Sequence, residues 1–335
     1  MRLTAFAALV LSSSVTTAAA AGLPVTFEFD DPRDGLYEAA TTALRDLHVQ
    51  ERVPVTIQVV PCGIGSTLEP YQCVNNTGFR FNWGNWMRAN PDIIDIGQHG
   101  NNHNEQLATV TRAQQLDILS GGLAEMQTWN LPGGRPFSMA APFASSNADT
   151  LSVLEELGYH ISVTNSGSCF PSATLDVYCE SVPVCQRNAQ GGRVTGPSCV
   201  VRSPAEILAE VDSKASEGKV FVVYHPQDMT FSDLVTVDPA KISALRTVLQ
   251  AFRQRELQGV YDLMTLETHY RAIHGLPTPG PGPSPTPTNP PPTPTPTATF
   301  GPSPTPTPTA PPAPTPTPAP GDMNVYQEAL ATPWI

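Results

Sequence analysis

The sequence predicts one α/β domain with parallel strands over residues 22–274. Short apolar runs rich in β-branched residues recur along this stretch, and segments of helical character lie between them. Strands that alternate with helices are typical of βαβ units, in which neighbouring strands run parallel. A stretch of about 250 residues is long enough for a single domain with one hydrophobic core.

The individual elements follow from these runs. We expect strands at residues 23–29, 53–60, 93–96, 161–163 and 220–224. We expect helices at residues 36–47, 112–129, 148–157, 205–214 and 239–255. Asp30 and Asp31 come directly after the first strand and His225 directly after the last, so polar residues stand where these two strands end.

Residues 1–21 have the pattern of a secretory signal peptide. A positive charge at Arg2 precedes an apolar stretch, and small residues continue to Ala21, where we expect cleavage. A membrane anchor is the alternative, but the apolar stretch is shorter than the roughly 20 residues that a spanning helix needs. No later segment is long and apolar enough to span a membrane. We therefore expect a soluble, secreted protein that works outside the cell or in the cell wall.

The six cysteines fit an exported protein, because export permits disulfides. A zinc site built from cysteines is disfavoured, since no Cys-x-x-Cys pair occurs. Cys62 and Cys73 could form a local bridge, but six cysteines allow many pairings and the sequence does not choose among them. The triplet 75–77, Asn-Asn-Thr, has the form of an N-glycosylation acceptor.

Residues 275–321 form a Pro/Thr-rich, low-complexity linker. Of the 37 prolines, 21 lie between Pro277 and Pro320, and no charged residue occurs from Gly275 to Gly321. Proline removes backbone donors and favours extended polyproline II, so we expect a disordered tail that acts as a stiff spacer. Its serine and threonine content suggests O-glycosylation. Residues 322–335 are too few for a domain and form a short C-terminal tail.

The charge of the chain limits its partners. The formal net charge is −12. Nucleic acids and anionic membrane surfaces are bound through basic faces, so neither is an expected partner. A neutral or basic polymer remains compatible with this charge.

A metal site is predicted by two histidines four residues apart, His99 and His103, whose imidazoles can face one cation. They need a third ligand. The best candidate is the acidic pair Asp30-Asp31 at the end of the first strand. Two histidines and one carboxylate leave positions open for water and substrate, as in catalytic zinc sites.

Two further segments accompany this motif: Ala141-Pro142-Phe143, and the strand from Val220 to Tyr224 that ends at His225. Together, and in this order, these residues resemble the polysaccharide deacetylase family, which is carbohydrate esterase family 4 with its NodB-homology domain. In that family an Asp-Asp pair ends the first strand. A His-Ser/Thr-x-x-His motif, an Arg-x-Pro-Phe/Tyr loop and a Leu-x-His strand end follow. The resemblance spans about residues 23–270.

The resemblance implies a fold and a place for the site. The fold is a distorted, NodB-like (β/α) barrel with seven parallel strands. In such barrels the active site collects at the carboxyl ends of the strands, which is where the aspartates and histidines named above would lie.

The resemblance also implies a role for each residue. Asp31, His99 and His103 would bind a divalent metal, most readily zinc. Asp30 would be the general base and His225 the general acid. Substrate would contact four residues, of which the last two occupy the position of the family's acetyl-methyl pocket: Pro142, Phe143, Val223 and Tyr224.

This chain departs from the family pattern at three motifs. Ala140 stands where the family has an arginine that pairs with the catalytic aspartate, and residues 161–166 offer no acid for the fourth motif. Arg135 and Asp228 are candidate replacements for these two groups. Gly100 replaces a Ser/Thr whose hydroxyl is not a ligand. Losses around a metal site typically cost about 10- to 100-fold in affinity or activity, so we expect a divergent enzyme rather than an inactive one.

The function expected from these observations is that of a secreted, monomeric, metal-dependent polysaccharide deacetylase. N-acetylglucosamine polymers such as chitin or peptidoglycan are the expected substrates, and O-acetyl xylan stays open. One alternative is a catalytically impaired, wall-associated carbohydrate-binding protein on the same fold. Hydrolysis of an amide in a small molecule is another. Phe81, Trp83 and Trp86 could line a sugar groove or belong to the core.

Overall fold

The computed structural model describes residues 22–32, 37–61, 82–103, 106–164, 169–179 and 181–277. The expected signal peptide, the bridge between Cys62 and Cys73, the glycosylation triplet, and the linker and tail from residue 278 onward lie outside the described residues. Within the described ranges, no helix combines the length and the hydropathy needed to cross a bilayer.

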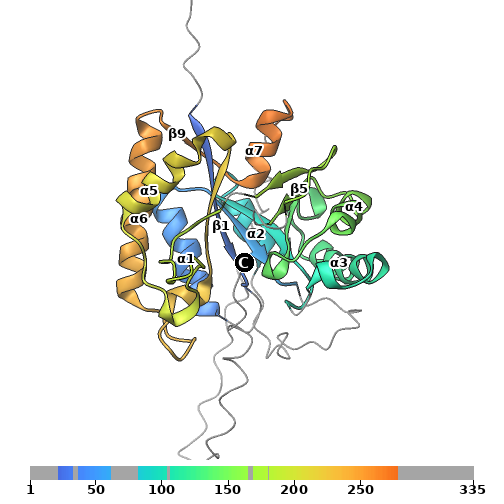
Figure 1. Cartoon of the computed structure of the whole chain (residues 1–335), viewed down its shortest axis with the longest axis horizontal. Coiled ribbons are helices and arrows are strands. Elements are labelled where there is room, and N and C mark those ends of the chain that lie inside the picture. Colours follow the sequence, from blue (N-terminus) through green and yellow to red (C-terminus); the bar gives the residue numbers. More distant parts are fainter. Residues whose placement is uncertain are drawn as a thin grey trace, which may run out of the picture.

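Parallel strands form one sheet that curls into a barrel with helices around it (Figure 1). Among the described residues the strands are β1 (Leu23–Asp30), β2 (Val55–Val59), β3 (Ile94–His99), β4 (Ser138–Ala140), β5 (Ile161–Val163), β6 (Asp176–Tyr178), β7 (Ser181–Pro183), β8 (Val220–Tyr224) and β9 (Tyr261–Leu263). Eight of them follow the order β6-β5-β4-β3-β2-β1-β8-β7, and β9 pairs with β1. The predicted α/β barrel with parallel strands is confirmed.

The barrel is nearly closed at β6 and β7. These two strands stand at opposite ends of the sheet, yet only two residues separate them in the chain. Two residues span only a short distance even when fully extended, so the two edges of the sheet lie beside each other. Because β6 is parallel to β5 and β7 is parallel to β8, β6 and β7 are two halves of one interrupted strand. The expected seven strands are therefore seen as eight along the sheet, with β9 added.

The helices are α1 (Glu38–Glu51), α2 (Trp83–Ala89), α3 (Arg112–Gln127), α4 (Ala148–Glu156), α5 (Pro204–Ser213), α6 (Pro239–Leu257) and α7 (Leu266–Ile273). The five predicted helices correspond to α1, α3, α4, α5 and α6. Capping boxes begin three of them, at Thr111, Asn147 and Ser203, where each side chain accepts a hydrogen bond from the backbone three residues on. The short helices α2 and α7 were not predicted.

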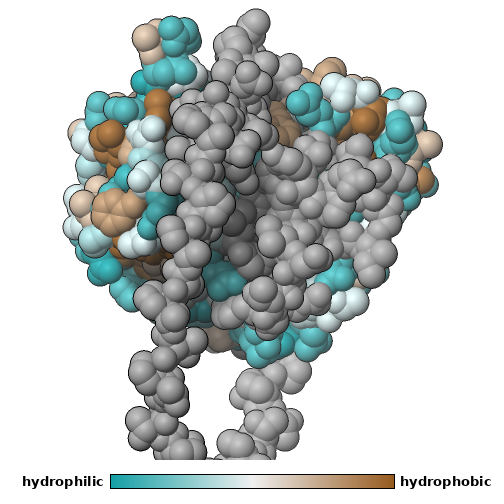
Figure 2. Space-filling model, turned by 90° about the horizontal axis from the view of Figure 1, so that it is seen from below, coloured by the Kyte–Doolittle hydropathy of each residue, from teal (hydrophilic) through white to brown (hydrophobic). Residues whose placement is uncertain are grey.

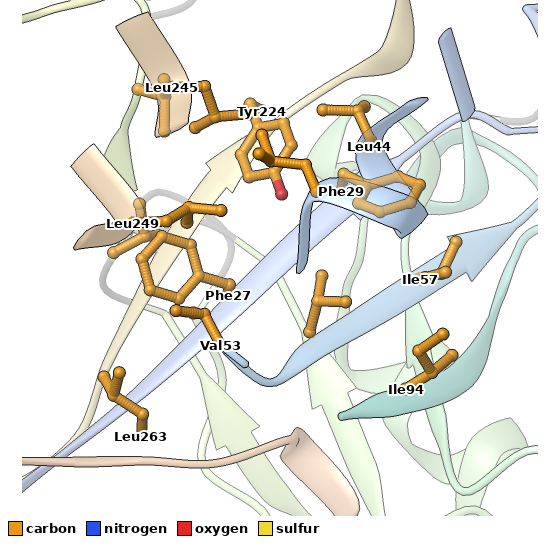
Figure 3. Close-up of a cluster of buried hydrophobic side chains, with 14 of the residues drawn as sticks. Phe27, Phe29, Leu44, Val53, Ile57, Ile94, Tyr224, Leu245, Leu249 and Leu263 are labelled. Carbon is orange, nitrogen blue, oxygen red and sulfur yellow. The ribbon is translucent and has the colours of Figure 1, made fainter. Parts of the chain in front are cut away.

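The main hydrophobic core lies between the barrel and the helices α1 and α6. Successive side chains of a strand point to opposite faces, so Val25, Phe27 and Phe29 of β1 all point outward, where they are fully buried. The ring of Phe27 packs edge-on against Phe252 of α6, with centroids 4.9 Å apart. Figure 3 shows Phe27 and Phe29 of β1 beside Leu245 and Leu249 of α6 in this core. The alternate residues of β1 therefore face the barrel interior, and these are polar.

The barrel interior has a polar side and an apolar side. Glu28 on β1, Gln58 on β2 and Asp95 on β3 are buried on the polar side. The apolar side is the cluster Ala140, Ile161, Val163, Tyr178, Phe221, Val223, Leu266 and Tyr270.

Helix α7 closes the barrel at the end where the strands begin. The N–H group of Leu266 donates to Thr56 Oγ1 at 2.9 Å, and the N–H group of Glu267 donates to Asp95 Oδ2 at 3.3 Å. The first turn of α7 thus satisfies polar groups that stand inside the barrel. Helix α7 does not cover the opposite end of the barrel, where the strands finish.

The indoles that could have lined a sugar groove belong to the core instead. Trp83 is 1% exposed and stacks near Trp129, with ring centroids 6.0 Å apart. Trp86 packs edge-on against Trp83 and lies under the guanidinium of Arg45, which is 4.0 Å from its ring centroid. Phe81 lies outside the described residues.

Among the described residues, two disulfides join cysteines that the sequence left unpaired: Cys169 with Cys179, and Cys185 with Cys199. Both close short loops. Disulfides are compatible with the expected export of the chain.

Candidate metal centre and active site

The carboxyl ends of β1, β3 and β8 bring the predicted site residues together. Asp30 is the last residue of β1 and Asp31 follows it, His99 is the last residue of β3, and His225 follows β8 directly. His103 lies four residues beyond the end of β3. Figure 2 shows the molecule from the side toward which β1 runs in Figure 1, and the described residues exposed there mix hydrophilic and hydrophobic types.

Asp31, His99 and His103 converge on one point. Asp31 Oδ1 lies 3.1 Å from His99 Nε2 and 2.6 Å from His103 Nε2. One ligand atom from each residue lies within 4.8 Å of the other two. This geometry suits a single cation shared by three ligands.

The tautomer of His99 supports the same reading. Its Nδ1 lies 3.0 Å from the carbonyl oxygen of Ala140, which can only accept, so Nδ1 carries the proton. In the neutral ring, Nε2 then presents an electron pair to Asp31 Oδ1. Two acceptors at this separation need a cation or a proton between them. Fixing a ligand imidazole through a backbone carbonyl is a common arrangement around metals.

The pKa values of Asp31 and His99 are shifted in opposite directions, and each shift favours the charged form of its side chain. Burial would raise the pKa of Asp31, but the charges of His103 and His225, with hydrogen bonds from His103 and His99, hold that pKa well below its usual value. Burial would lower the pKa of His99, but the hydrogen bond to Asp31 and the charges of Asp30 and Asp31 raise it. A metal ion that binds here would compete with protons for the same donor atoms.

The backbone around the site is strained at several residues. Asp31, His103, Phe143 and Ala144 have φ values of 71°, 63°, 56° and 51°. Left-handed conformations are uncommon for residues other than glycine, and they cluster at functional sites. Gly100 has a φ of 62°, which gives a physical reason for a glycine where the resembled family has Ser/Thr.

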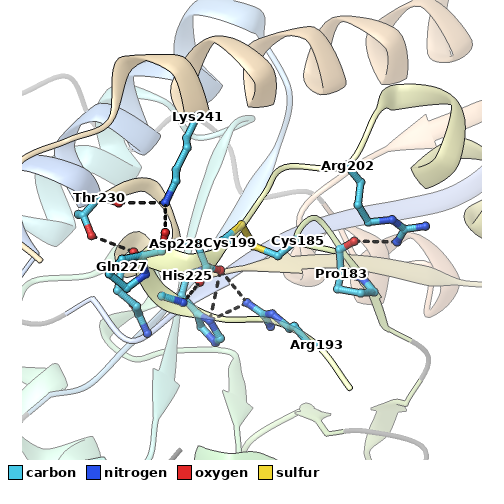
Figure 4. The surroundings of a disulfide bond; sticks show 12 residues. Pro183, Cys185, Arg193, Cys199, Arg202, His225, Gln227, Asp228, Thr230 and Lys241 are labelled. Carbon is cyan, nitrogen blue, oxygen red and sulfur yellow. Dashed lines mark hydrogen bonds and ion pairs between the residues drawn. A yellow bond between two sulfur atoms is a disulfide. The ribbon is translucent and has the colours of Figure 1, made fainter. Parts of the chain in front are cut away.

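His225 stands across from the three-residue cluster. Its Nε2 lies 3.9 Å from Asp31 Oδ2, and its Nδ1 lies 3.5 Å from Asp228 Oδ2 (Figure 4). The backbone N–H group of His225 also donates to Asp228 Oδ2 at 2.8 Å. Asp228 therefore occupies the place beside His225 that we proposed for it.

The proposed replacement of the family arginine by Arg135 is wrong. Arg135 donates to the carbonyl oxygen of Leu157 at 2.5 Å, and its guanidinium lies over the ring of Tyr159. These contacts hold it between α4 and the outer face of the sheet. Ala140 itself faces the barrel interior, in the apolar cluster.

Asp30 has a carboxyl neighbour instead of an arginine. Its Oδ1 is buried and has no hydrogen-bond donor among the described residues. Glu28 lies two residues earlier on the same face of β1 and is fully buried. Burial first, and then the charge of Asp30, raise the pKa of Glu28 well above its usual value, although Arg193 opposes them. Both carboxyl oxygens of Glu28 are buried without a hydrogen-bond partner among the described residues.

Two residues that contact the site were missed by the sequence analysis. The side-chain amide of Gln227 donates to Asp31 Oδ2 at 2.5 Å and so orients the carboxylate. Its position two residues after His225, in the turn Pro226–Met229, was a signal that could have been used. Arg193 contacts both His225 and Asp228, and nothing in its local sequence indicated this.

The expected substrate-contacting residues divide into two groups. Phe143 packs against His103, with ring centroids 4.8 Å apart, and Pro142 is buried in the same turn. Val223 faces the barrel interior. Tyr224 lies on the opposite face of β8, where it is fully buried and its hydroxyl bonds to His48, so its side chain points away from the site.

No family model and no curated protein matches the sequence. Among solved structures, a protein from Mycobacterium smegmatis assigned to the polysaccharide deacetylases is similar over 78% of this chain and 95% of its own, with a TM-score of 0.51 and 15% sequence identity. The chain has the polysaccharide deacetylase fold. At this identity the likeness establishes the fold and leaves the activity to be argued from the residues.

Two other structures have the same kind of likeness. A family 4 carbohydrate esterase from Streptomyces lividans, in complex with acetate, shares 15% identity over 72% of this chain and 91% of its own, with a TM-score of 0.42. A family 4 acetyl xylan esterase from Clostridium thermocellum, with a cobalt ion, shares 15% identity over 76% of this chain and 93% of its own, with a TM-score of 0.45. TM-scores below 0.5 add no weight to the first likeness.

Proposed function

We propose that the protein is a secreted, metal-dependent polysaccharide deacetylase that removes N-acetyl groups from N-acetylglucosamine polymers of the chitin or peptidoglycan kind. The observation that carries the proposal is the convergence of Asp31, His99 and His103 on one point, with His225 facing the same carboxylate. The deacetylase fold and the position of these residues at the strand ends agree with it.

The donor set fits a zinc ion. Two imidazole nitrogens and one carboxylate oxygen are a ligand set of catalytic zinc sites, and they leave a position for water or substrate. Asp31, His99 and His103 would hold the metal, with Gln227 and the Ala140 carbonyl fixing two of the ligands. A divalent cation bound there supplies Lewis acidity, which polarises the acetyl carbonyl and makes a nearby water easier to deprotonate.

The two neighbouring aspartates divide the remaining work. Asp31 is turned out of the strand by its left-handed backbone, with a φ of 71°, while Asp30 remains part of β1. Asp30 is the general base that takes a proton from the attacking water. Glu28, two residues earlier on the same face of β1, is buried, and burial raises its pKa.

A ring whose Nδ1 accepts from Arg193 is neutral, so His225 would present its Nε2–H group to the reacting bond as a hydrogen-bond donor, and Asp30 would return to the departing nitrogen the proton that it took from the water. The Nε2 atom of His225 faces Asp31, which places that nitrogen toward the reacting bond. The side chains of Phe143 and Val223 offer apolar surface for the acetyl methyl group, and Pro142 shapes the turn that carries Phe143.

A carbohydrate-binding protein without activity is the second candidate. The observation that favours it is Ala140, which leaves Asp30 without the arginine that the resembled family provides. In that case the protein would bind glycans equally well with and without metal.

Acetate release from acetylated chitooligosaccharides and xylan tests the proposal. We expect release that stops with a chelator and returns with zinc. Substitution His103→Ala should abolish it, whereas His274→Ala, which changes an exposed histidine paired with Asp176, should leave it intact. Metal bound at the site without acetate from any substrate would refute the deacetylase. Glycan binding that ignores the chelator would then favour the second candidate.

A further inference from the structure

A hairpin between β7 and α5 reaches the site from outside the barrel. A disulfide between Cys185 and Cys199 closes it. An antiparallel backbone β-bridge between Arg187 and Arg193 pairs its two arms. Backbone hydrogen bonds, such as the one from Asn188 N–H to the Gly192 carbonyl at 2.7 Å, continue that pairing. We call residues 185–199 the disulfide hairpin.

The disulfide hairpin is anchored beside His225 by a buried carboxylate. Asp228 is fully buried, and its Oδ1 accepts from the backbone N–H of Gly196 at 2.5 Å. Its Oδ2 accepts from Arg193 at 3.1 Å. On the other side, Lys241 Nζ donates to the carbonyl oxygens of Pro197 and Thr230 at 2.7 Å and 3.0 Å (Figure 4). These contacts of Asp228 and Lys241 with the hairpin fix the position of Arg193 beside His225.

Arg193 decides which nitrogen of His225 carries a proton. A guanidinium nitrogen of Arg193 lies 2.6 Å from His225 Nδ1. Arginine has five N–H donors and no acceptor, so Nδ1 must accept this hydrogen bond and is unprotonated. The proton of the neutral ring then sits on Nε2, which faces Asp31 Oδ2 across 3.9 Å.

Asp228 alone would favour the opposite tautomer. A carboxylate only accepts, and Asp228 Oδ2 lies 3.5 Å from His225 Nδ1. Without the arginine, this carboxylate would draw the proton to Nδ1, on the side of the ring away from Asp31. Arg193 satisfies both the carboxylate and the ring nitrogen, and it reverses this preference.

We infer that Arg193 is a positioning residue carried by the disulfide hairpin. Arg193 holds the neutral His225 imidazole with its proton on Nε2, and this proton points toward Asp31. The inference rests on the proposed function only for its catalytic consequence. The tautomer itself is a property of the protein whether or not it is an enzyme.

Nitrogen NMR of the protein labelled with ¹⁵N-histidine tests the inference on the neutral rings, which alkaline pH selects. The wild-type protein should show an unprotonated Nδ1 and a protonated Nε2 at His225. In Arg193→Met the proton should move to Nδ1, toward Asp228. The control Arg187→Met removes an exposed arginine of the same hairpin, which pairs with Glu210, and should leave the His225 signals unchanged.

Two results would overturn the inference: a proton on Nδ1 in the wild-type protein, or an unchanged tautomer in Arg193→Met. The wild-type spectrum decides the matter alone if the variant does not fold. On acetylated glycans, Arg193→Met should lower kcat by about 10- to 100-fold with little change in KM, as losses around a metal site do. The predicted tautomers without any deacetylation would leave the inference standing and remove the proposed function.

Discussion

The carbonyl oxygen of Ala140 accepts a hydrogen bond from His99 Nδ1 at 3.0 Å, and it thereby turns the unprotonated side of the imidazole toward Asp31. Ala140 has lost the arginine side chain of the resembled family, yet its backbone still orients a metal ligand. An alanine at this position therefore lacks the arginine side chain but keeps the carbonyl group that orients His99.

Metal binding should depend on the three converging residues. We expect His99→Ala and Asp31→Asn each to weaken zinc binding by at least about 10-fold, because each removes one of three ligands. Isothermal titration calorimetry on the metal-free protein measures this effect. His274→Ala serves as the matched control, since His274 is exposed and lies outside the cluster. Equal affinities in all three variants would place the metal elsewhere.

The Asp228 carboxylate should contribute strongly to stability. Burial would raise the pKa of Asp228, but the charge and hydrogen bond of His225, the charge of Arg193 and the Gly196 N–H group lower it. A lowered pKa in the folded state adds stability above the ordinary aspartate pKa, and this stability is lost as pH falls through the folded-state value.

Asp228→Asn should therefore cost about 3–5 kcal/mol near neutral pH, because it leaves a partly buried arginine without its anion. Urea unfolding at neutral pH and at about pH 3 measures the difference, which should shrink in acid. Glu156→Gln removes an exposed pair with Arg112 and should cost less than about 1 kcal/mol. A loss for Asp228→Asn as small as that of the control would contradict the anchoring role.

Much of the fold could be predicted because its signals are local. Apolar runs rich in β-branched residues located strands such as β1 and β8, and segments of helical character between them located helices such as α3 and α5. The convergence of Asp31, His99 and His103 could also be predicted, because Asp31 and His99 stand at strand ends and His103 follows His99 by four residues. The division of the closing strand into β6 and β7 could not be predicted. It depends on how the two edges of the sheet come together, and no local sequence pattern indicates this.

The surroundings of His225 illustrate what sequence could not give. Asp228 could be proposed because it follows His225 by three residues in one turn. Arg193 lies 32 residues before His225 and reaches it only through a hairpin whose disulfide pairing the sequence left open. Tyr224 was placed by its neighbour in the chain, but strand alternation turns it to the opposite face of β8 from Val223.

The Glu28 side chain should make stability fall as pH rises. Burial first, and then the charge of Asp30, raise the pKa of Glu28 well above its usual value, while the charge of Arg193 opposes the shift. The folded state then binds a proton that the unfolded chain releases. This contribution is fully present below the ordinary glutamate pKa and is lost as pH rises through the folded-state pKa.

Glu28→Gln keeps the size of the side chain and removes the ionisation. As pH rises from the ordinary glutamate pKa of about 4.3 toward the folded-state pKa, the unfolding free energy of the wild type should fall relative to the variant by up to about 1.4 kcal/mol per pH unit. Urea unfolding across this range measures the two slopes. Glu217→Gln, at an exposed position, should follow the wild type. Parallel curves for Glu28→Gln and the wild type would mean that Glu28 is ionised inside the barrel.

The two disulfides should differ in their effect on activity although they are alike in their effect on stability. The bridges join residues 10 and 14 positions apart, so removing either one should cost about 3 kcal/mol through the entropy of the unfolded chain. Only the bridge between Cys185 and Cys199 closes the hairpin that carries Arg193. Replacing both of its cysteines with serine should therefore lower kcat as Arg193→Met does and move the His225 proton to Nδ1.

The matched double serine variant at Cys169 and Cys179 should lose stability while keeping the wild-type tautomer, because its loop makes no contact with His225 among the described residues. Equal changes in kcat and tautomer in both double variants would show that general loosening of the barrel, and not the loss of Arg193 from its place, governs His225.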